Sequence, residues 1–181
     1  PHVPPLAQDR RVTIMGLGEL GRACAEALRD FGFDVAGWSR RAKDIDGVTC
    51  LHGNEGLETA LTRADILVLL LPKTPATENL LNAERLSWMP KGAMIVNPGR
   101  GPLIDDDALL ATLNSGHIAH ATLDVFRVEP LPKDHPYWAH SNVTVTPHIA
   151  SETRVNTSSE VVAENVRRGE AGEPFVHVVD R

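Results

Sequence analysis

Residues 16–21 read Gly-Leu-Gly-Glu-Leu-Gly, and this stretch decides the fold that the sequence predicts. Its pattern is G-x-G-x-x-G, which is weak evidence alone because glycines also serve ordinary turns. A β-rich run, Arg11–Met15, precedes it, and residues 19–31 after it place apolar side chains on one helical stripe. Between a strand and a helix, the first glycine permits a tight turn, the second lets the backbone approach a pyrophosphate, and the third allows close helix packing. We therefore expect a dinucleotide-binding loop.

Strand-like and helix-like runs alternate along the rest of the chain. We expect six strands, over residues 11–15, 33–38, 66–71, 93–97, 118–124 and 143–146, and helices over residues 19–31, 57–63, 82–89, 105–114 and 151–168. Residues 66–71 are all aliphatic, which is typical of a strand buried on both faces of a parallel sheet. The alternation predicts an α/β fold with a doubly wound parallel sheet, the three-layer αβα arrangement of the Rossmann fold. Residues 1–10 read as a linker, and residues 11–181 as one dinucleotide-binding domain.

Composition limits the class of protein. The chain has 181 residues, of which 42% are hydrophobic and 23% charged, as expected for one ordinary folded domain. Its net charge of -6 argues against a nucleic-acid partner. No apolar run is long enough to span a bilayer, and the first residues do not resemble a signal peptide. Cys24 and Cys50 form no C-x-x-C pair, so we expect no metal site and two reduced thiols in a cytoplasmic protein.

The end of the second expected strand bears on the cofactor. A dinucleotide-binding domain that uses NAD usually has an acid there, which binds the ribose hydroxyls. This chain has Ser39 at that place, followed by Arg40 and Arg41. Guanidinium groups can bind a 2′-phosphate that a carboxylate would repel, so the turn predicts NADPH, with NADH possible. A solvated basic turn is the alternative, and Trp38 could line the adenine pocket or pack in the core.

Three later segments place reactive side chains directly after strands. Arg100 lies in the segment 97–101, Asp124 ends the fifth expected strand with Glu129 soon after, and His148 lies in the segment 146–150. Ligands of a doubly wound sheet bind beyond the carboxyl ends of its strands. We therefore expect the arginine, the two acids and the histidine to gather where the cofactor lies.

These motifs resemble the D-2-hydroxyacid dehydrogenases, and within them the NADPH-using glyoxylate and hydroxypyruvate reductases. The resemblance covers nearly all of the chain. It rests on the ordered Arg100, Glu129 and His148 set and on the Trp38-Ser39-Arg40 turn. The other matching segments are the glycine loop, Leu70-Leu71-Pro72 with Thr74 and Thr77, residues 97–101, 123–130 and 146–150, and the closing Val179-Asp180-Arg181.

The resemblance implies a role for each residue. Arg100 would bind the substrate carboxylate and polarise the keto oxygen. His148 would protonate that oxygen as general acid, and Glu129 would fix the histidine ring and favour its protonated form. Asp124 would contact the nicotinamide carboxamide or its ribose. The expected cofactor contacts are Gly16, Gly18, Glu19, Leu20, Gly21, Ser39, Arg40, Arg41, Leu71, Pro72, Thr77, Pro98, Gly99, Arg100, Asp124, His148 and Ala150.

Other interpretations stay open. Arg100 could be a surface turn residue, Glu129 a solvated acid, and Asp124 a cap at the strand end. The substrate class implied is a small 2-keto or 2-hydroxy acid. The alternatives are a dehydrogenase for D-lactate or phosphoglycerate and, from another class, an NAD(H)-sensing module like the C-terminal-binding-protein corepressors, which keep an acid where Ser39 stands.

The sequence shows no counterpart of the substrate-binding domain that members of this family have. Members carry a substrate-binding domain ahead of the glycine loop, whereas the first strand expected in this chain begins at Arg11. We expect the chain to be the cofactor domain of a larger enzyme. The active-site cleft would lie between this domain and the substrate-binding domain, so this chain would supply only one of its two sides. Family members usually dimerise through this domain, so the resemblance also implies a homodimer.

Overall fold

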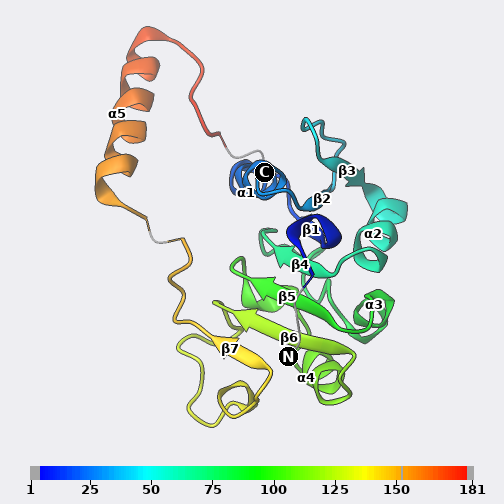
Figure 1. Cartoon of the computed structure of the whole chain (residues 1–181). Coiled ribbons are helices and arrows are strands. Elements are labelled where there is room, and N and C mark those ends of the chain that lie inside the picture. Colours follow the sequence, from blue (N-terminus) through cyan, green and yellow to red (C-terminus); the bar gives the residue numbers. More distant parts are fainter. Residues whose placement is uncertain (1–4, 152, 179–181) are drawn as a thin grey trace. The chain divides into compact units, whose positions relative to one another are not determined.

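The computed structural model describes residues 5–151 and 153–178. The described residues fall into two compact units, which divide between Ala150 and Ser151. The first unit is a seven-stranded, wholly parallel sheet in the order β3-β2-β1-β4-β5-β6-β7 (Figure 1). The strands are β1 (Arg11–Met15), β2 (Asp34–Ser39), β3 (Thr49–His52), β4 (Ile66–Leu69), β5 (Ala93–Asn97), β6 (Ile118–Leu123) and β7 (Val143–Val145). The doubly wound parallel sheet predicted from the sequence is therefore confirmed.

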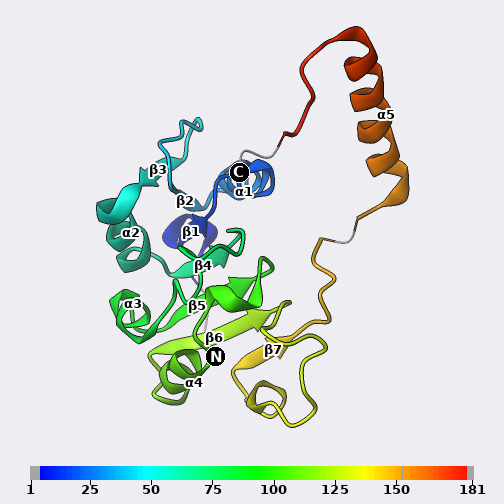
Figure 2. The same ribbon diagram turned by 180° about the vertical axis from the view of Figure 1, so that it is seen from behind.

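Helices cover both faces of this sheet. They are α1 (Glu19–Asp30), α2 (Gly53–Thr62), α3 (Ala83–Trp88) and α4 (Asp106–Asn114), with short 3-10 helices η1 (Ala7–Asp9), η2 (Gly101–Leu103) and η3 (Pro136–Trp138). Figures 1 and 2 show α1 on one face and α2, α3 and α4 on the other. The chain winds outward from β1 through β2 to β3 and then crosses back to β4. The topological switch point, where a crevice opens at the carboxyl ends, thus lies between β1 and β4.

The hydrophobic core explains why these segments form strands. Ile14 and Met15 of β1 and Leu67 and Leu69 of β4 are fully buried, as expected for the central strands of a parallel sheet. The core contains a larger cluster, which runs from Met15 to Tyr137, and a smaller one beneath α1 that includes Val12, Ile14 and Leu17. The apolar residues of the predicted central strands are therefore the ones that the fold buries.

Several element predictions need correction. The expected count of six strands is wrong, because residues 49–52 add β3 at the edge of the sheet. Helix α2 begins at Gly53 rather than residue 57, and β4 ends at Leu69 because Leu70 and Leu71 already belong to the loop. The last helix, α5 (Val155–Ala171), begins four residues later than expected. Trp38 is a core residue whose Nε1 donates to the Gly53 carbonyl at 2.8 Å.

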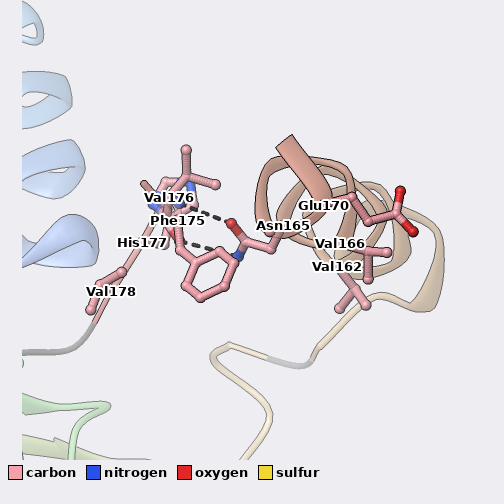
Figure 3. Close-up of a pocket in the computed structure, with 9 residues that line it drawn as sticks. Val162, Asn165, Val166, Glu170, Phe175, Val176, His177 and Val178 are labelled. Carbon is pink, nitrogen blue, oxygen red and sulfur yellow. Dashed lines mark hydrogen bonds between the residues drawn. The ribbon is translucent and has the colours of Figure 1, made fainter. Parts of the chain in front are cut away.

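The second unit consists of α5 and the segment that follows it. Gly172 ends the helix in the left-handed conformation, with φ of 69°. The Asn165 side chain then binds the Val176 backbone in both directions, Oδ1 accepting at 2.9 Å and Nδ2 donating at 3.2 Å. Figure 3 shows the apolar groove that results between the helix and Phe175.

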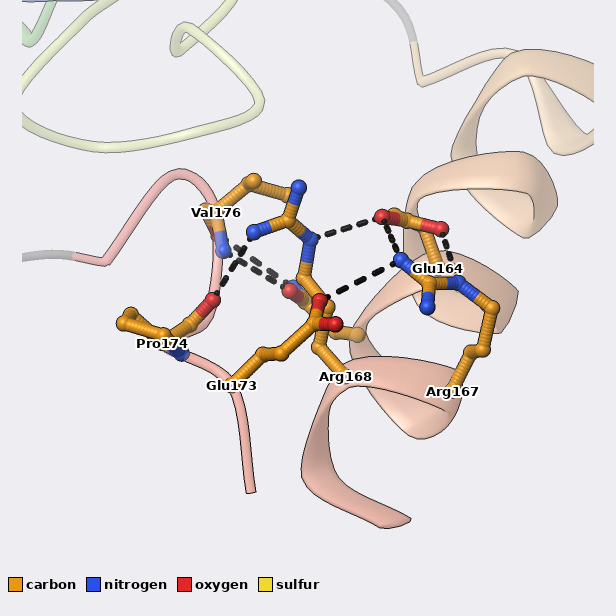
Figure 4. A network of polar contacts seen from close by, with 7 residues as sticks. Glu164, Arg167, Arg168, Glu173, Pro174 and Val176 are labelled. Carbon is orange, nitrogen blue, oxygen red and sulfur yellow. Dashed lines mark hydrogen bonds and ion pairs between the residues drawn. The ribbon is translucent and has the colours of Figure 1, made fainter. Parts of the chain in front are cut away.

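Charged side chains brace the same unit. Glu164 accepts hydrogen bonds from Arg167 and Arg168, and Arg168 also donates to the Pro174 carbonyl at 3.1 Å (Figure 4). The hydrogen bonds from Arg167 and then Arg168 lower the pKa of Glu164 to about 2. None of the side chains of α5 is buried.

Among the described helices, none combines the length and the apolar character that crossing a bilayer requires.

Candidate active site

The glycine loop joins β1 to α1 at the switch point. Gly16 has φ of 111°, and a Cβ atom there would lie 2.8 Å from the Leu70 carbonyl oxygen, so only glycine fits this turn. A Cβ at Gly21 would lie 1.7 Å from the Gly16 carbonyl oxygen, because the helix packs tightly on the loop. Gly18 faces open space, with no atom within 4 Å of a built Cβ. The loop therefore has the space for a phosphate that its sequence pattern predicts.

Helix α1 adds an electrostatic reason for an anion to bind here. Gly18 is its N-cap and supplies no side-chain cap to the first turn. The amide groups of such a turn point outward, and the helix dipole favours negative charge beside them. Leu71 and Pro72 follow β4, the neighbour of β1 across the switch point, so they lie beside this loop.

The turn after β2 carries the predicted basic residues. Ser39 is buried, and its hydroxyl donates to the Arg41 carbonyl at 2.7 Å, which closes the turn. Arg40 and Arg41 are exposed. In the loop after β4, Thr77 Oγ1 donates to the Pro72 carbonyl at 2.7 Å and accepts from the Thr74 amide at 2.8 Å. Thr77 therefore shapes its own loop.

His148 and Glu129 are in direct contact. His148 Nδ1 lies 2.8 Å from Glu129 Oε2, while Glu129 Oε1 accepts from the Phe126 amide at 2.9 Å. A carboxylate only accepts hydrogen bonds, so Nδ1 carries the hydrogen and Nε2 is the nitrogen that can give or take a proton. The loops after β6 and β7 thus assemble an oriented histidine.

The charge on Glu129 is favoured by its neighbours. Partial burial acts to raise the pKa of Glu129, but the hydrogen bonds from Phe126 and His148 and the charges of His148 and Arg100 outweigh it. The net effect lowers the pKa below the ordinary value of glutamate. Glu129 is therefore an anion at neutral pH and suited to stabilise a protonated His148.

Asp124 holds the histidine loop. It is 4% exposed, and it accepts hydrogen bonds from Thr146 Oγ1 at 2.5 Å, the Ile149 amide at 3.0 Å and the Ala150 amide at 2.9 Å. Burial acts to raise the pKa of Asp124, yet these hydrogen bonds and the charge of His148 outweigh it and lower the pKa. His148 itself has φ of 55°, a strained conformation for a residue other than glycine. The hydrogen bonds on both sides of His148 offset this strain.

Arg100 lies in the loop after β5. The buried Asn97 shapes this loop, since its Oδ1 accepts from the Gly99 amide at 3.1 Å and its Nδ2 donates to the Arg100 carbonyl at 3.0 Å. The Arg100 side chain is exposed, with Nη1 2.6 Å from the Gly99 carbonyl oxygen. Its charge is the smallest of the contributions that lower the pKa of Glu129. The structure therefore brings His148 and Glu129 into contact, whereas Arg100 contacts neither of them in the hydrogen bonds of the described residues.

The sequence places Asn97 and Thr146 in matching segments, but their supporting hydrogen bonds were not predicted. Those of Asn97 could have been predicted, because a polar residue that ends an aliphatic strand before a glycine-containing turn commonly bonds to that turn. The hydrogen bond from Thr146 to Asp124 joins residues 22 positions apart, and no local pattern indicates it. No group of three or more His, Cys, Asp or Glu side chains that could hold a metal ion occurs in residues 5–151 and 153–178.

Comparison with known proteins identifies the family. The family described as D-isomer specific 2-hydroxyacid dehydrogenase, NAD binding domain, matches residues 4–150. The chain belongs to this family. Glyoxylate/hydroxypyruvate reductase A of Yersinia enterocolitica is 44% identical over 169 residues, which cover 93% of this chain and 54% of the relative. The chain spans about half the length of the curated relatives it matches.

Solved structures of family members share the same fold. The D-isomer specific 2-hydroxyacid dehydrogenase of Xanthobacter autotrophicus Py2, in complex with NADPH and MES, is 52% identical with a TM-score of 0.94, covering 99% of this chain and 74% of that one. The NADPH-dependent glyoxylate/hydroxypyruvate reductase of Sinorhizobium meliloti, in complex with NADP and sulfate, is 38% identical with a TM-score of 0.94, covering 99% and 58%. The family resemblance inferred from the sequence is confirmed.

Proposed function

We propose that this chain is the cofactor-binding part of an NADPH-dependent reductase that converts a small 2-keto acid, such as glyoxylate or hydroxypyruvate, to the 2-hydroxy acid. The observation that carries the proposal is the 2.8 Å contact between His148 and Glu129, on the carboxyl edge that also holds the glycine loop and Arg100. The names of the Yersinia and Sinorhizobium relatives support the substrate class.

The described residues fit a dinucleotide. The open space at Gly18 and the uncapped first turn of α1 would hold the pyrophosphate. The exposed Arg40 and Arg41 would bind a 2′-phosphate beside Ser39, where no acid stands to repel it. The remaining predicted contacts are Gly16, Glu19, Leu20, Gly21, Leu71, Pro72, Thr77, Pro98, Gly99 and Ala150. When bound, the nicotinamide supplies the hydride.

The reacting centre lies among the charged side chains. The Arg100 guanidinium binds the carboxylate of the 2-keto acid by paired hydrogen bonds and polarises its keto oxygen. His148 Nε2 gives a proton to that oxygen. Glu129 keeps the ring oriented and stabilises the imidazolium before the proton leaves. Asp124 keeps the loop of His148 in place through its three hydrogen bonds, and its contact with the nicotinamide is a prediction for the protein with cofactor bound.

The assembly and compartment belong to the same proposal. By resemblance to its family, we expect the protein to be a homodimer in the cytoplasm, with a substrate-binding domain that completes the cleft. Sedimentation velocity of the full-length protein measures the oligomeric state directly.

Replacement of the histidine tests the reaction. In the full-length protein, His148→Gln should lower kcat for glyoxylate-dependent oxidation of NADPH by about 10²-fold or more, because the general acid is lost. The NADPH dissociation constant should stay within about threefold, because the glycine loop and the turn after β2 would supply the phosphate contacts, and His148 would meet only the nicotinamide end.

His120→Gln is the matched control. His120 Nε2 contacts Thr144 Oγ1 at 2.9 Å within the sheet and lies outside the proposed site. This variant should keep the wild-type kcat. If His148→Gln kept it as well, the proposed role of His148 would be wrong.

A further inference from the structure

Arg127 is the centre of a polar cluster on the carboxyl side of the sheet. Its Nη2 donates to the Ile104 carbonyl at 2.6 Å and to the Asn79 side-chain oxygen. Its Nε lies 3.4 Å from Asp106 Oδ2, and its Nη1 lies 3.6 Å from Glu78 Oε1. One guanidinium therefore joins segments that follow three different strands.

A buried tyrosine fixes the far side of this cluster. The Tyr137 hydroxyl donates to Asp106 Oδ1 at 2.8 Å, and the Tyr137 ring is 2% exposed. Burial and the neighbouring Asp106 raise the pKa of Tyr137, so its hydroxyl stays protonated and acts as a donor. Asp106 is also the first residue of α4. The acid that faces Arg127 is thus anchored to the rigid part of the fold.

Each segment that Arg127 joins is close in sequence to a residue of the proposed site. Arg127 is two residues before Glu129 in the same loop. Ile104 ends the short helix η2, whose N-cap is Arg100. Asn79 follows the loop of Pro72 and Thr77, and its amide donates to the Pro102 carbonyl at 2.9 Å. The contacts of Arg127 therefore link the segments of Arg100 and Glu129.

The backbones of these two segments also pass unusually close to each other. A Cβ at Gly101 would lie 2.0 Å from the Phe126 carbonyl carbon and 2.5 Å from the Arg127 amide. The two loops are in contact directly after Arg100 and two to three residues before Glu129. A small displacement of one loop would therefore change the spacing between the two catalytic candidates.

We propose that Arg127 is a positioning residue, which holds the loop of Glu129 against the loop of Arg100 and so sets the geometry in which the 2-keto acid is bound. The inference rests on the proposed function. Arginine suits this task because its planar fork can bind several acceptors at once, which the single ammonium of lysine cannot do. Arg127 touches neither substrate nor cofactor and acts through Arg100 and Glu129.

The test is steady-state kinetics of the full-length protein with glyoxylate and NADPH. Arg127→Met should raise KM for glyoxylate and lower kcat/KM by about 10- to 100-fold, the loss typical of a misplaced reacting group. KM for NADPH should stay within about twofold, because its phosphates bind at the other loops. Arg127→Lys should recover part of kcat/KM, since an ammonium can still bind the Ile104 carbonyl or Asp106.

Two further variants separate positioning from general stability. Arg11→Met removes a comparable ion pair, with Asp65 at 2.7 Å, at the amino end of β1. It should lower the melting temperature and leave KM for glyoxylate unchanged. If Arg127→Met does not fold, Asn79→Gly removes one acceptor of Arg127 while glycine keeps the left-handed backbone at φ of 49°, and it should raise KM for glyoxylate.

The outcomes distinguish the two proposals. A wild-type protein that is folded but does not reduce glyoxylate with NADPH would contradict the proposed function. An active wild type whose Arg127→Met variant keeps both KM and kcat/KM would overturn the role of Arg127. Equal losses of kcat/KM in Arg127→Met and Arg11→Met would also overturn it, because general destabilisation would then explain both.

Discussion

Glu129 is the residue on whose charge the orientation of His148 depends. Its carboxylate accepts hydrogen bonds from His148 and from the Phe126 amide, and these interactions outweigh burial and lower its pKa in the folded protein. A folded-state pKa below the unfolded value means that the unfolded chain takes up the proton first as the pH falls. The charged Glu129 therefore stabilises the fold above its unfolded pKa, and this contribution is lost as the pH falls through the folded value.

This lowered pKa gives a prediction for unfolding as a function of pH. Glu129→Gln should reduce the free energy of unfolding by at most about 1 kcal/mol at pH 5, because solvent screens a half-exposed pair. The difference from wild type should hold down to the ordinary glutamate pKa of about 4.3 and shrink as the pH falls further, through the lower pKa of the folded protein. Urea titrations across this range measure it. A difference that grew on acidification would contradict the assigned direction of the pKa.

Single residues also show how far the sequence could predict the site. The places of His148 and Glu129 after strands predicted that they lie at one edge of the sheet, the family resemblance implied their contact, and the structure contains it. The three hydrogen bonds of Asp124 to residues 146, 149 and 150 were not expected, because they depend on how two loops meet. The cluster around Arg127 was missed for the same reason. Motifs identify the reactive groups, whereas their supports come from tertiary packing.

At the scale of elements, the loop between β1 and α1 contains one glycine that folding requires and another that cofactor binding requires. A Cβ at Gly21 would overlap the Gly16 carbonyl oxygen, whereas a Cβ at Gly18 would meet nothing. Gly18 also has φ of -77°, which any residue can adopt. The two glycines therefore serve different purposes within one motif.

Alanine at each position tests that distinction. Gly21→Ala should lower the free energy of unfolding by about 1–3 kcal/mol or more, because the backbone must shift to remove the overlap. Gly18→Ala should change stability by less than about 0.5 kcal/mol. It should nevertheless weaken NADPH binding about tenfold, since the methyl group would occupy the space of the pyrophosphate. Denaturation and fluorescence titration measure the two effects. Normal NADPH affinity in Gly18→Ala would place the phosphates elsewhere.

The elements themselves were predicted well where they are long and apolar. The central strands and α1 agree with the sequence within one or two residues, because a buried strand and an amphipathic helix have strong periodic signals. Strand β3 was missed because it has only four residues, none of them fully buried, at the edge of the sheet. The first turn of α2 was missed because Gly53 and Gly56 have low helix propensity.

At the scale of the whole molecule, the first unit has the features of an independent domain. The two hydrophobic clusters lie entirely within residues 12–137, and the described helix of the second unit buries none of its side chains. The glycine loop, the basic turn, Arg100, Glu129 and His148 all belong to residues 1–150 as well. Folding and cofactor binding should therefore need only the first unit.

A truncated chain tests this independence. Residues 1–150 alone should unfold cooperatively, with a free energy within about 1 kcal/mol of the 181-residue chain, since no apolar core is removed. The dissociation constant for NADPH should be unchanged. Circular dichroism with urea and fluorescence titration give the two values. A truncated chain that fails to fold would show that residues 151–181 are part of the same cooperative unit.

The central claim is that this domain binds a dinucleotide with a 2′-phosphate through the turn after β2. The most direct measurement is a calorimetric titration of the chain with NADPH and with NADH, repeated for Arg40→Asp. NADPH should bind at least about tenfold more tightly, since hydrogen bonds to charged groups each contribute about 1.5–3 kcal/mol. The aspartate variant should lose or reverse this preference, because its carboxylate would repel the phosphate. Equal affinities of the wild-type chain for NADPH and NADH would contradict the account.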